Sequence, residues 1–342
     1  MSEIARSVDP LTRAPSGSPL CGSPPPLLRE GGKGPQFSSP ACGGGVERSE
    51  TEGVARSALK AGAGLIDRLG AEIETIALRQ GSTRAAALVR IIIALLILAK
   101  WSEEFALFRA DHIGLIVLSP IYFGAALLML AGFRTKAAVF AMSLVLGLLY
   151  FGYGKLGGVH EWAHHHCYML LAVTALLNGA PCEKSYSVDR WLALRRAARQ
   201  GCDPPAERGF TWAQRLIVLQ MGALYFWTAI DKTEPYFLNG QRLERIFEWA
   251  YAGHPLYDVI TAPPLLAAAS CLVVGLEYFL GYALIAGRMK RAAFVIALGL
   301  HVLFYWLLKV DTYSATMIAL YLLYADPDRV HRAIDAMHGR AA

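Results

Sequence analysis

The sequence predicts an all-α membrane protein: a polytopic transmembrane bundle of about eight helices, with amphipathic helices at the membrane surface. Hydrophobic residues make up 55% of the 342 residues and charged residues only 18%. From Ala85 onward, apolar runs of about 17 to 23 residues recur, and a run of that length spans a hydrocarbon core of about 30 Å. Basic residues gather in alternate loops between these runs, which is typical of polytopic membrane proteins.

The N-terminal segment, residues 1–80, differs in composition from the rest of the chain. Its first 55 residues are rich in proline and glycine and lack any apolar periodicity, so we expect disorder. Apolar residues at helical spacing then predict a short amphipathic helix on the membrane; they are Leu65, Ile66, Leu69, Ile73 and Ile76. We therefore interpret residues 1–80 as a low-complexity cytoplasmic tail that contains this helix. We see no signal peptide in it.

The predicted transmembrane domain covers residues 81–326. Its spans lie at about 85–101, 113–131, 137–153, 164–179, 213–231, 264–286, 291–308 and 312–325. Two connecting segments, 186–199 and 240–251, have apolar residues along one helical face, which predicts helices that lie at the membrane surface. Residues 327–342 are expected to form a short cytoplasmic tail.

Lysine and arginine residues concentrate in four segments outside the spans. These segments are 132–136, 180–212, 287–291 and the C-terminus. In an eight-span topology all four lie on one side of the membrane, which the positive-inside rule assigns to the cytoplasm. We therefore expect both termini in the cytoplasm and the protein in a bacterial inner membrane. Because these loops account for the net charge of +6, the charge does not indicate a nucleic-acid partner.

The stretch HEWAHHH, residues 160–166, places four histidines within seven residues and raises the question of a metal site. On a helix His160 and His164 would share a face, and imidazoles at that spacing can hold zinc or iron. The string also matches one histidine box of membrane di-iron enzymes, but the further boxes of those enzymes are missing here. The six cysteines are scattered and form no CxxC pair. We therefore expect neither a metal site nor a disulfide framework.

Ionisable residues within or beside the spans are candidates for function, because they are costly in a membrane. His166 lies at the outer end of the fourth span, Lys232 at the outer end of the fifth, and His301 in the outer half of the seventh. A desolvated lysine has a lowered pKa and can act as a base, and histidine can shuttle protons. Chain direction thus predicts an acid/base site near the extracytoplasmic leaflet. Arg90, early in the first span, is expected to extend its charge to the inner interface. Glu277, near the middle of the sixth span, has either a structural partner, such as Arg90 or a tyrosine, or a functional role.

Four stretches of the chain carry a resemblance to a known family. They are LVRIIIALLILAKWSEE (88–104), HHHCYMLLAVTALLNGAPCEKSYSVDRW (164–191), LQMGALYFWTAIDKTEPYFLNG (219–240) and LGLHVLFYWLLKVDTYSATMIALYLL (298–323). In order and approximate spacing they resemble the HTTM family, the membrane domain shared with vitamin K-dependent gamma-carboxylase. The resemblance implies that Lys232 is the base that deprotonates a quinol, and that His166 and His301 belong to the same site. Asp231 and Thr233 depart from the carboxylase pattern beside this lysine.

These observations lead to two hypotheses about function. The first is a membrane protein that acts on a quinol or another lipophilic substrate by acid/base chemistry, as a carboxylase- or epoxidase-like oxidoreductase or lyase. The sequence ends without the large extracytoplasmic region of the carboxylase, which favours a lipophilic substrate over a protein substrate. The second is a non-catalytic lipid- or small-molecule-binding protein, or a complex subunit. The lipid bilayer and a quinone are the expected partners, and the sequence does not identify a cofactor or a protein partner.

Overall fold

The computed structural model describes residues 71, 74–75, 77–106, 113–160, 162–308 and 310–339. All of them belong to one compact unit, Lys60–Ala342. Within these residues the protein is almost entirely helical, with a single two-stranded sheet, so the predicted all-α fold class is confirmed. The predicted disorder of residues 1–55, and most of the amphipathic helix at 56–80, lie outside the described residues.

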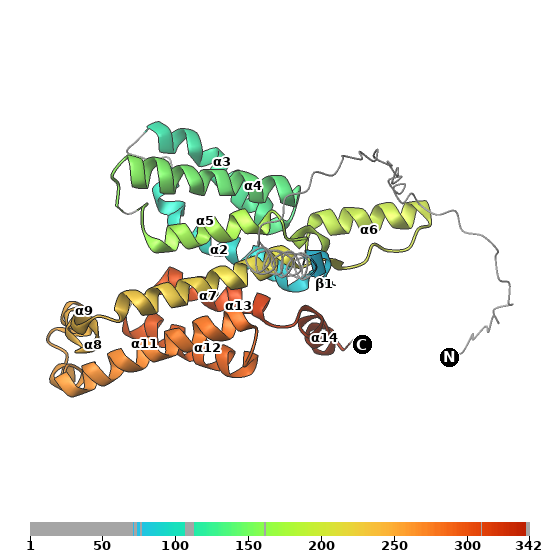
Figure 1. The fold of residues 1–342 in the computed structure, drawn as a ribbon. Coiled ribbons are helices and arrows are strands. Elements are labelled where there is room, and N and C mark those ends of the chain that lie inside the picture. The colour runs from blue at the N-terminus through green and yellow to red at the C-terminus, as the bar shows by residue number, and fades with distance from the viewer. Residues whose placement is uncertain are drawn as a thin grey trace, which may run out of the picture. The chain divides into compact units, whose positions relative to one another are not determined.

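Each of the eight predicted spans corresponds to a helix (Figure 1). These are α2 (Arg84–Phe105), α3 (Ile113–Ala131), α4 (Thr135–Gly147) with its π-helical continuation η1 (Leu148–Leu156), α5 (His165–Leu177), α7 (Trp212–Lys232), α11 (Pro263–Ala286), α12 (Lys290–Leu307) and α13 (Asp311–Tyr324). Five are long and apolar enough to cross a membrane, namely α2, α3, α4 with η1, α11 and α12. Helices α5 and α13 have only 13 and 14 residues. A count of eight spans therefore stays a prediction.

The helices pack into one bundle with an apolar outer surface. Helix α7 packs most extensively on α11, and α13 packs on both α2 and α7, so that α13 joins the early helices to the late ones. In Figure 1, α3 and α4 lie on one side of the bundle and α11 and α12 on the other. Large apolar side chains also face outward, and Trp227, Val295 and Trp306 are 72%, 67% and 65% exposed. Such a surface is suited to lipid rather than to water.

Shorter elements connect the bundle helices. They are η2 (Cys182–Lys184), α6 (Val188–Gln200), α8 (Pro235–Leu238), α9 (Gln241–Tyr251), α10 (Tyr257–Ile260) and α14 (Pro327–Met337), together with strands β1 (Gln80–Ser82) and β2 (Arg208–Phe210). Helices α6 and α9 form where the sequence predicted surface helices. Strands β1 and β2 pair antiparallel, with Gly81 opposite Gly209. These strands were not predicted, because three residues are too few to show an alternating pattern.

A network of charged residues joins α2, α6 and α14 to the segment before β2. Arg84 binds Glu207 through Nε at 2.8 Å and Asp335 through Nη1 at 2.6 Å. Arg190 Nε lies 3.3 Å from the other Glu207 oxygen, and His331 Nε2 lies 3.2 Å from the other Asp335 oxygen. We call these five residues the Arg84 network. It fixes α14 to the start of the bundle.

Arg90 in α2 holds the loop after α5. Its side chain is fully buried, and its guanidinium donates to the backbone carbonyls of Cys182 at 3.1 Å and Tyr186 at 2.6 Å. Arg90 therefore does not supply the partner that the sequence analysis considered for Glu277. The two carbonyl oxygens accept hydrogen bonds from the guanidinium and so stabilise its positive charge in the protein interior.

Asp189, in the first turn of α6, caps a different helix. Its carboxylate accepts hydrogen bonds from the backbone N–H groups of Arg134 at 2.9 Å and Thr135 at 2.8 Å, and from the Thr135 hydroxyl at 2.8 Å. These N–H groups begin α4 and have no partner within that helix. Asp189 therefore fixes the turn between α3 and α4 against α6.

Candidate functional site

Lys232 ends α7 and forms an ion pair with Glu277 in the middle of α11. Lys232 Nζ and Glu277 Oε1 are 2.5 Å apart, and the two side chains are 22% and 4% exposed. A charged pair with so little solvent contact is costly unless the partners neutralise one another. Helices α7 and α11 are thus joined at this point by opposite charges.

His301 lies on α12 and is fully buried. Its Nε2 atom is hydrogen-bonded to the Tyr225 hydroxyl at 2.6 Å. The Tyr321 hydroxyl in turn donates to the Tyr225 hydroxyl at 3.4 Å, which extends the chain of polar groups to α13. Tyr225 precedes Lys232 on α7 by about two helical turns, so both side chains lie on the same face of α7.

Aromatic rings connect the ion pair with His301. Lys232 Nζ lies 5.7 Å from the ring centroid of Phe237 and 6.0 Å from that of Phe304. The ring centroids of Phe304 and His301 are 5.9 Å apart. The structure therefore brings together two of the three residues that the sequence predicted for the site, Lys232 and His301. We call Lys232, Glu277, Tyr225, His301 and Tyr321 the Lys232 site.

His165, rather than His166, extends from α5 toward the Lys232 site. The ring of His165 meets that of Tyr313 edge-on, with 5.2 Å between centroids, and Tyr313 meets His301 in the same way at 5.8 Å. His166 stacks on His164 at 4.9 Å and lies 6.5 Å from the Trp101 ring of α2. His166 thus faces α2, and its predicted part in the site stays a prediction.

The histidines at the start of α5 also form a compact cluster of ring nitrogens. One nitrogen from each of His164, His165 and His166 lies within 4.8 Å of the others, a spacing that one metal ion could bridge. The first two side chains are exposed and the third is half-buried. Our expectation that the protein holds no metal stays a prediction.

Two buried polar atoms of the Lys232 site have no hydrogen-bond partner in the described part of the chain. They are Oε2 of Glu277, whose carboxylate also lies near the Thr228 side chain, and Nδ1 of His301. Leaving a buried polar atom unpaired costs about 1 to 3 kcal/mol, so such atoms call for an explanation such as a missing ligand. Together they give the site two open hydrogen-bonding positions beside a fixed positive charge. This arrangement can bind a hydroxyl group and stabilise the anion that the hydroxyl forms when it loses its proton.

The sequence predicted Lys232 and His301 as site residues, whereas no sequence pattern pointed to Tyr225 or Tyr321. Tyrosine is common in membrane helices, so neither residue stood out. Glu277 was recognised only as a buried acid with an unknown partner. The spacing of Tyr225 and Lys232 on one helix face was the one signal that could have linked the tyrosine to the site.

A comparison with protein-family models finds the HTTM domain over residues 102–329. The match covers more than half of the chain and includes every residue of the Lys232 site. No curated protein and no solved structure matches the chain.

Proposed function

Because this chain belongs to the HTTM domain family and is an integral membrane protein, we propose that it binds a quinol or another lipophilic hydroxyl compound at the Lys232 site and removes a proton from it. One observation carries the proposal. The buried lysine–glutamate pair has an unpaired carboxylate oxygen, and His301, which the Phe304 ring links to Lys232, has an unpaired ring nitrogen.

The ion pair supplies both a proton acceptor and a compensating charge. A substrate hydroxyl that donates to Oε2 of Glu277 can pass its proton to the carboxylate. Lys232 then remains an ammonium group, and its charge stabilises the substrate anion. The resemblance noted above implies that Lys232 is itself the base. In a pair at this distance the proton can reside on either partner, so we treat the pair as one basic unit.

The surroundings of the pair suit a flat, apolar substrate. Phe237 and Phe304 flank Lys232, and aromatic rings favour both cations and other planar rings. His301, hydrogen-bonded to Tyr225, can orient a second polar atom of the ligand through Nδ1. We propose His166 as a further member of the site, and His165 as the alternative because it contacts Tyr313.

The proposed location follows the charge distribution of the loops. The Lys232 end of the bundle would face the extracytoplasmic leaflet of a bacterial inner membrane, with the basic loops and both termini in the cytoplasm. A substrate could then enter sideways from the lipid. An oxidoreductase or lyase step on the resulting anion would follow from this first proton transfer.

An anaerobic pH titration of bound quinol tests the proposal directly. The purified protein is mixed with a reduced quinol, and the absorbance of the quinol anion is followed. We expect bound quinol to deprotonate at a pH about one lower than free quinol, because an adjacent cation stabilises the anion. The variant Lys232→Met should remove this difference, and Glu277→Gln should reduce it. The variant Asp231→Asn alters the exposed neighbour of Lys232 and should leave the titration unchanged.

Turnover is measured separately, as quinol loss and oxygen uptake in reconstituted membranes. A folded Lys232→Met protein that keeps the full titration difference and full turnover would contradict the proposal. In that case the pair and the His301–Tyr225 bond would serve only to join helices, as in the non-catalytic alternative.

A further inference from the structure

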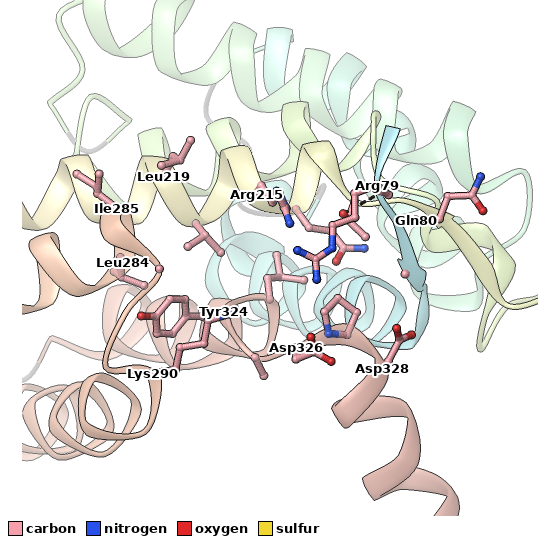
Figure 2. Close-up of a pocket in the computed structure, with 18 residues that line it drawn as sticks. Arg79, Gln80, Arg215, Leu219, Leu284, Ile285, Lys290, Tyr324, Asp326 and Asp328 are labelled. Atoms are coloured by element: carbon pink, nitrogen blue, oxygen red, sulfur yellow. Dashed lines mark hydrogen bonds between the residues drawn. The ribbon is translucent and has the colours of Figure 1, made fainter. Parts of the chain in front are cut away.

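A cavity of about 380 Å³ lies at the other end of α7 from Lys232 (Figure 2). Its walls come from the first turns of α7, the turn between α11 and α12, the start of β1 and the junction of α13 with α14. Gln214 in this wall and Lys232 are separated by about 27 Å along α7, at 1.5 Å per residue. The cavity is therefore a second site, and nothing in the proposed function uses it.

Three basic side chains from different parts of the chain line this cavity. They are Arg79, Arg215 and Lys290, and they lie near enough to repel one another. Figure 2 shows Arg79 and Arg215 together on one side of the cavity and Lys290 beside Tyr324 across from them. Among the described residues, none of the three side chains has an ion pair or a hydrogen bond. Asp326 attracts Lys290, and the Lys290 ammonium also lies 5.2 Å from the ring centroid of Tyr324, but Arg79 and Arg215 repel it. The basic side chains thus outnumber the carboxylate near them, which favours an anionic ligand.

The acidic residues of the cavity wall are already engaged elsewhere. Asp326 accepts a hydrogen bond from the Arg329 backbone N–H at 3.0 Å and caps α14. Asp328 is paired with Arg208 at 3.1 Å and accepts from the Ser82 N–H at 3.2 Å. Asp328 is thus paired outside the cavity, and Asp326, which also attracts Lys290, offsets only part of the charge of the three basic side chains.

Gln214 gives a second, independent indication of a ligand. Its side chain lines the cavity, the residue is only 2% exposed, and both its amide nitrogen and its amide oxygen lack a hydrogen-bond partner in the described part of the chain. Such a group is unfavourable in a folded protein unless something pairs with it. A ligand with both an acceptor and a donor, such as a phosphate oxygen and a hydroxyl, would satisfy both atoms.

The rest of the wall is apolar. It consists of Val218, Leu219, Leu284, Ile285 and Leu323. Leu219 and Ile285 are also exposed on the outer surface of the bundle, where lipid would lie. The ligand therefore needs a charged end for the basic side chains and an apolar end for this wall. We infer that the cavity binds the phosphate headgroup of an anionic phospholipid, whose acyl chains pass along Leu219 and Ile285.

Lipid binding by the full-length protein in detergent tests this inference. Retention of phosphatidylglycerol is measured by native mass spectrometry, and the shift in thermal unfolding is measured with phosphatidylglycerol, phosphatidylcholine or inorganic phosphate. We expect phosphatidylglycerol to bind best. Arg215→Gln and Lys290→Gln should each weaken its binding by about tenfold, the equivalent of one charge-assisted hydrogen bond. Arg199→Gln removes the same charge from an exposed position on α6 outside the cavity, and should change the affinity less than twofold.

Each alternative result is decisive. If Arg199→Gln weakens binding as much as Arg215→Gln, the lipid responds to general surface charge and the inference is wrong. If inorganic phosphate stabilises the protein and phosphatidylglycerol does not, the ligand is a free anion and not a lipid. Lys290 is exposed, so Lys290→Gln should fold, and it can replace Arg215→Gln in the test if that variant does not fold. Lys232→Met should retain phosphatidylglycerol whatever its effect on quinol, so the two proposals can fail separately.

Discussion

The Arg84 network and the Lys232 site both join helices through charged groups, but they differ in how completely their atoms are paired. In the Arg84 network, both oxygens of Glu207 and both oxygens of Asp335 contact a basic group. In the Lys232 site, Glu277 uses one oxygen and leaves the other buried without a partner. In a saturated network, every charged oxygen already has a protein partner, so no oxygen is free to bind a ligand. An unsaturated network keeps a buried oxygen without a partner. This lowers stability but allows the oxygen to bind a ligand, as expected of a functional site.

The largest effect should come from removing the centre of the saturated network. We expect Arg84→Ala to destabilise the protein by about 3 kcal/mol, because it leaves Glu207 and Asp335 largely buried without their main partner. Thermal unfolding in detergent measures the loss. As a control, Arg208→Ala breaks the ion pair with Asp328, which lies at the same end of the bundle and is about half exposed to solvent. This loss should be no more than about 0.5 kcal/mol. Equal losses would show that the Arg84 network has no special structural role.

An intermediate effect should come from breaking the unsaturated pair. Lys232→Met and Glu277→Gln should each cost about 2 kcal/mol, because each leaves its partner without a counter-charge. The double variant should recover to within about 1 kcal/mol of the wild-type protein, because no charge is then left unpaired. It should still fail to bind quinol. A double variant as unstable as the sum of the single variants would show that the two side chains do not stabilise one another, and the prediction would be wrong.

A smaller effect than in the two charged clusters should come from the helix cap that Asp189 provides. Asp189→Ala removes the acceptor for the first N–H groups of α4 and should cost about 1 kcal/mol of stability. Asp189→Asn keeps an acceptor for the two bonds from Thr135 but turns an NH2 group toward the Arg134 N–H, so it should restore only part of that loss. Thermal unfolding distinguishes the two variants. If they behave alike, the negative charge of Asp189 matters more than its hydrogen bonds.

The positions of the helices could be read from the sequence, but their contacts could not. Long apolar runs identified α2, α3, α11 and α12, because only a helix of this length satisfies its backbone within a membrane. The amphipathic patterns of α6 and α9 predicted surface helices, because an apolar face can lie on the membrane while the polar face meets water. Helix α14 was expected to be part of a tail. Its attachment through Asp335 to Arg84 joins residues far apart in the sequence, which local patterns do not reveal.

By itself, the sequence determined the helical class, the apolar character of the bundle and the placing of Lys232 and His301 toward one end of their helices. It could do so because helix length and chain direction are local properties. Only the tertiary structure decided that Lys232 meets Glu277, that His301 meets Tyr225, and that Gln214 lines a cavity with Arg215. These contacts depend on how each helix is rotated about its own axis. A helix that is apolar on every side carries little information about that rotation, so the packing of its neighbours decides it.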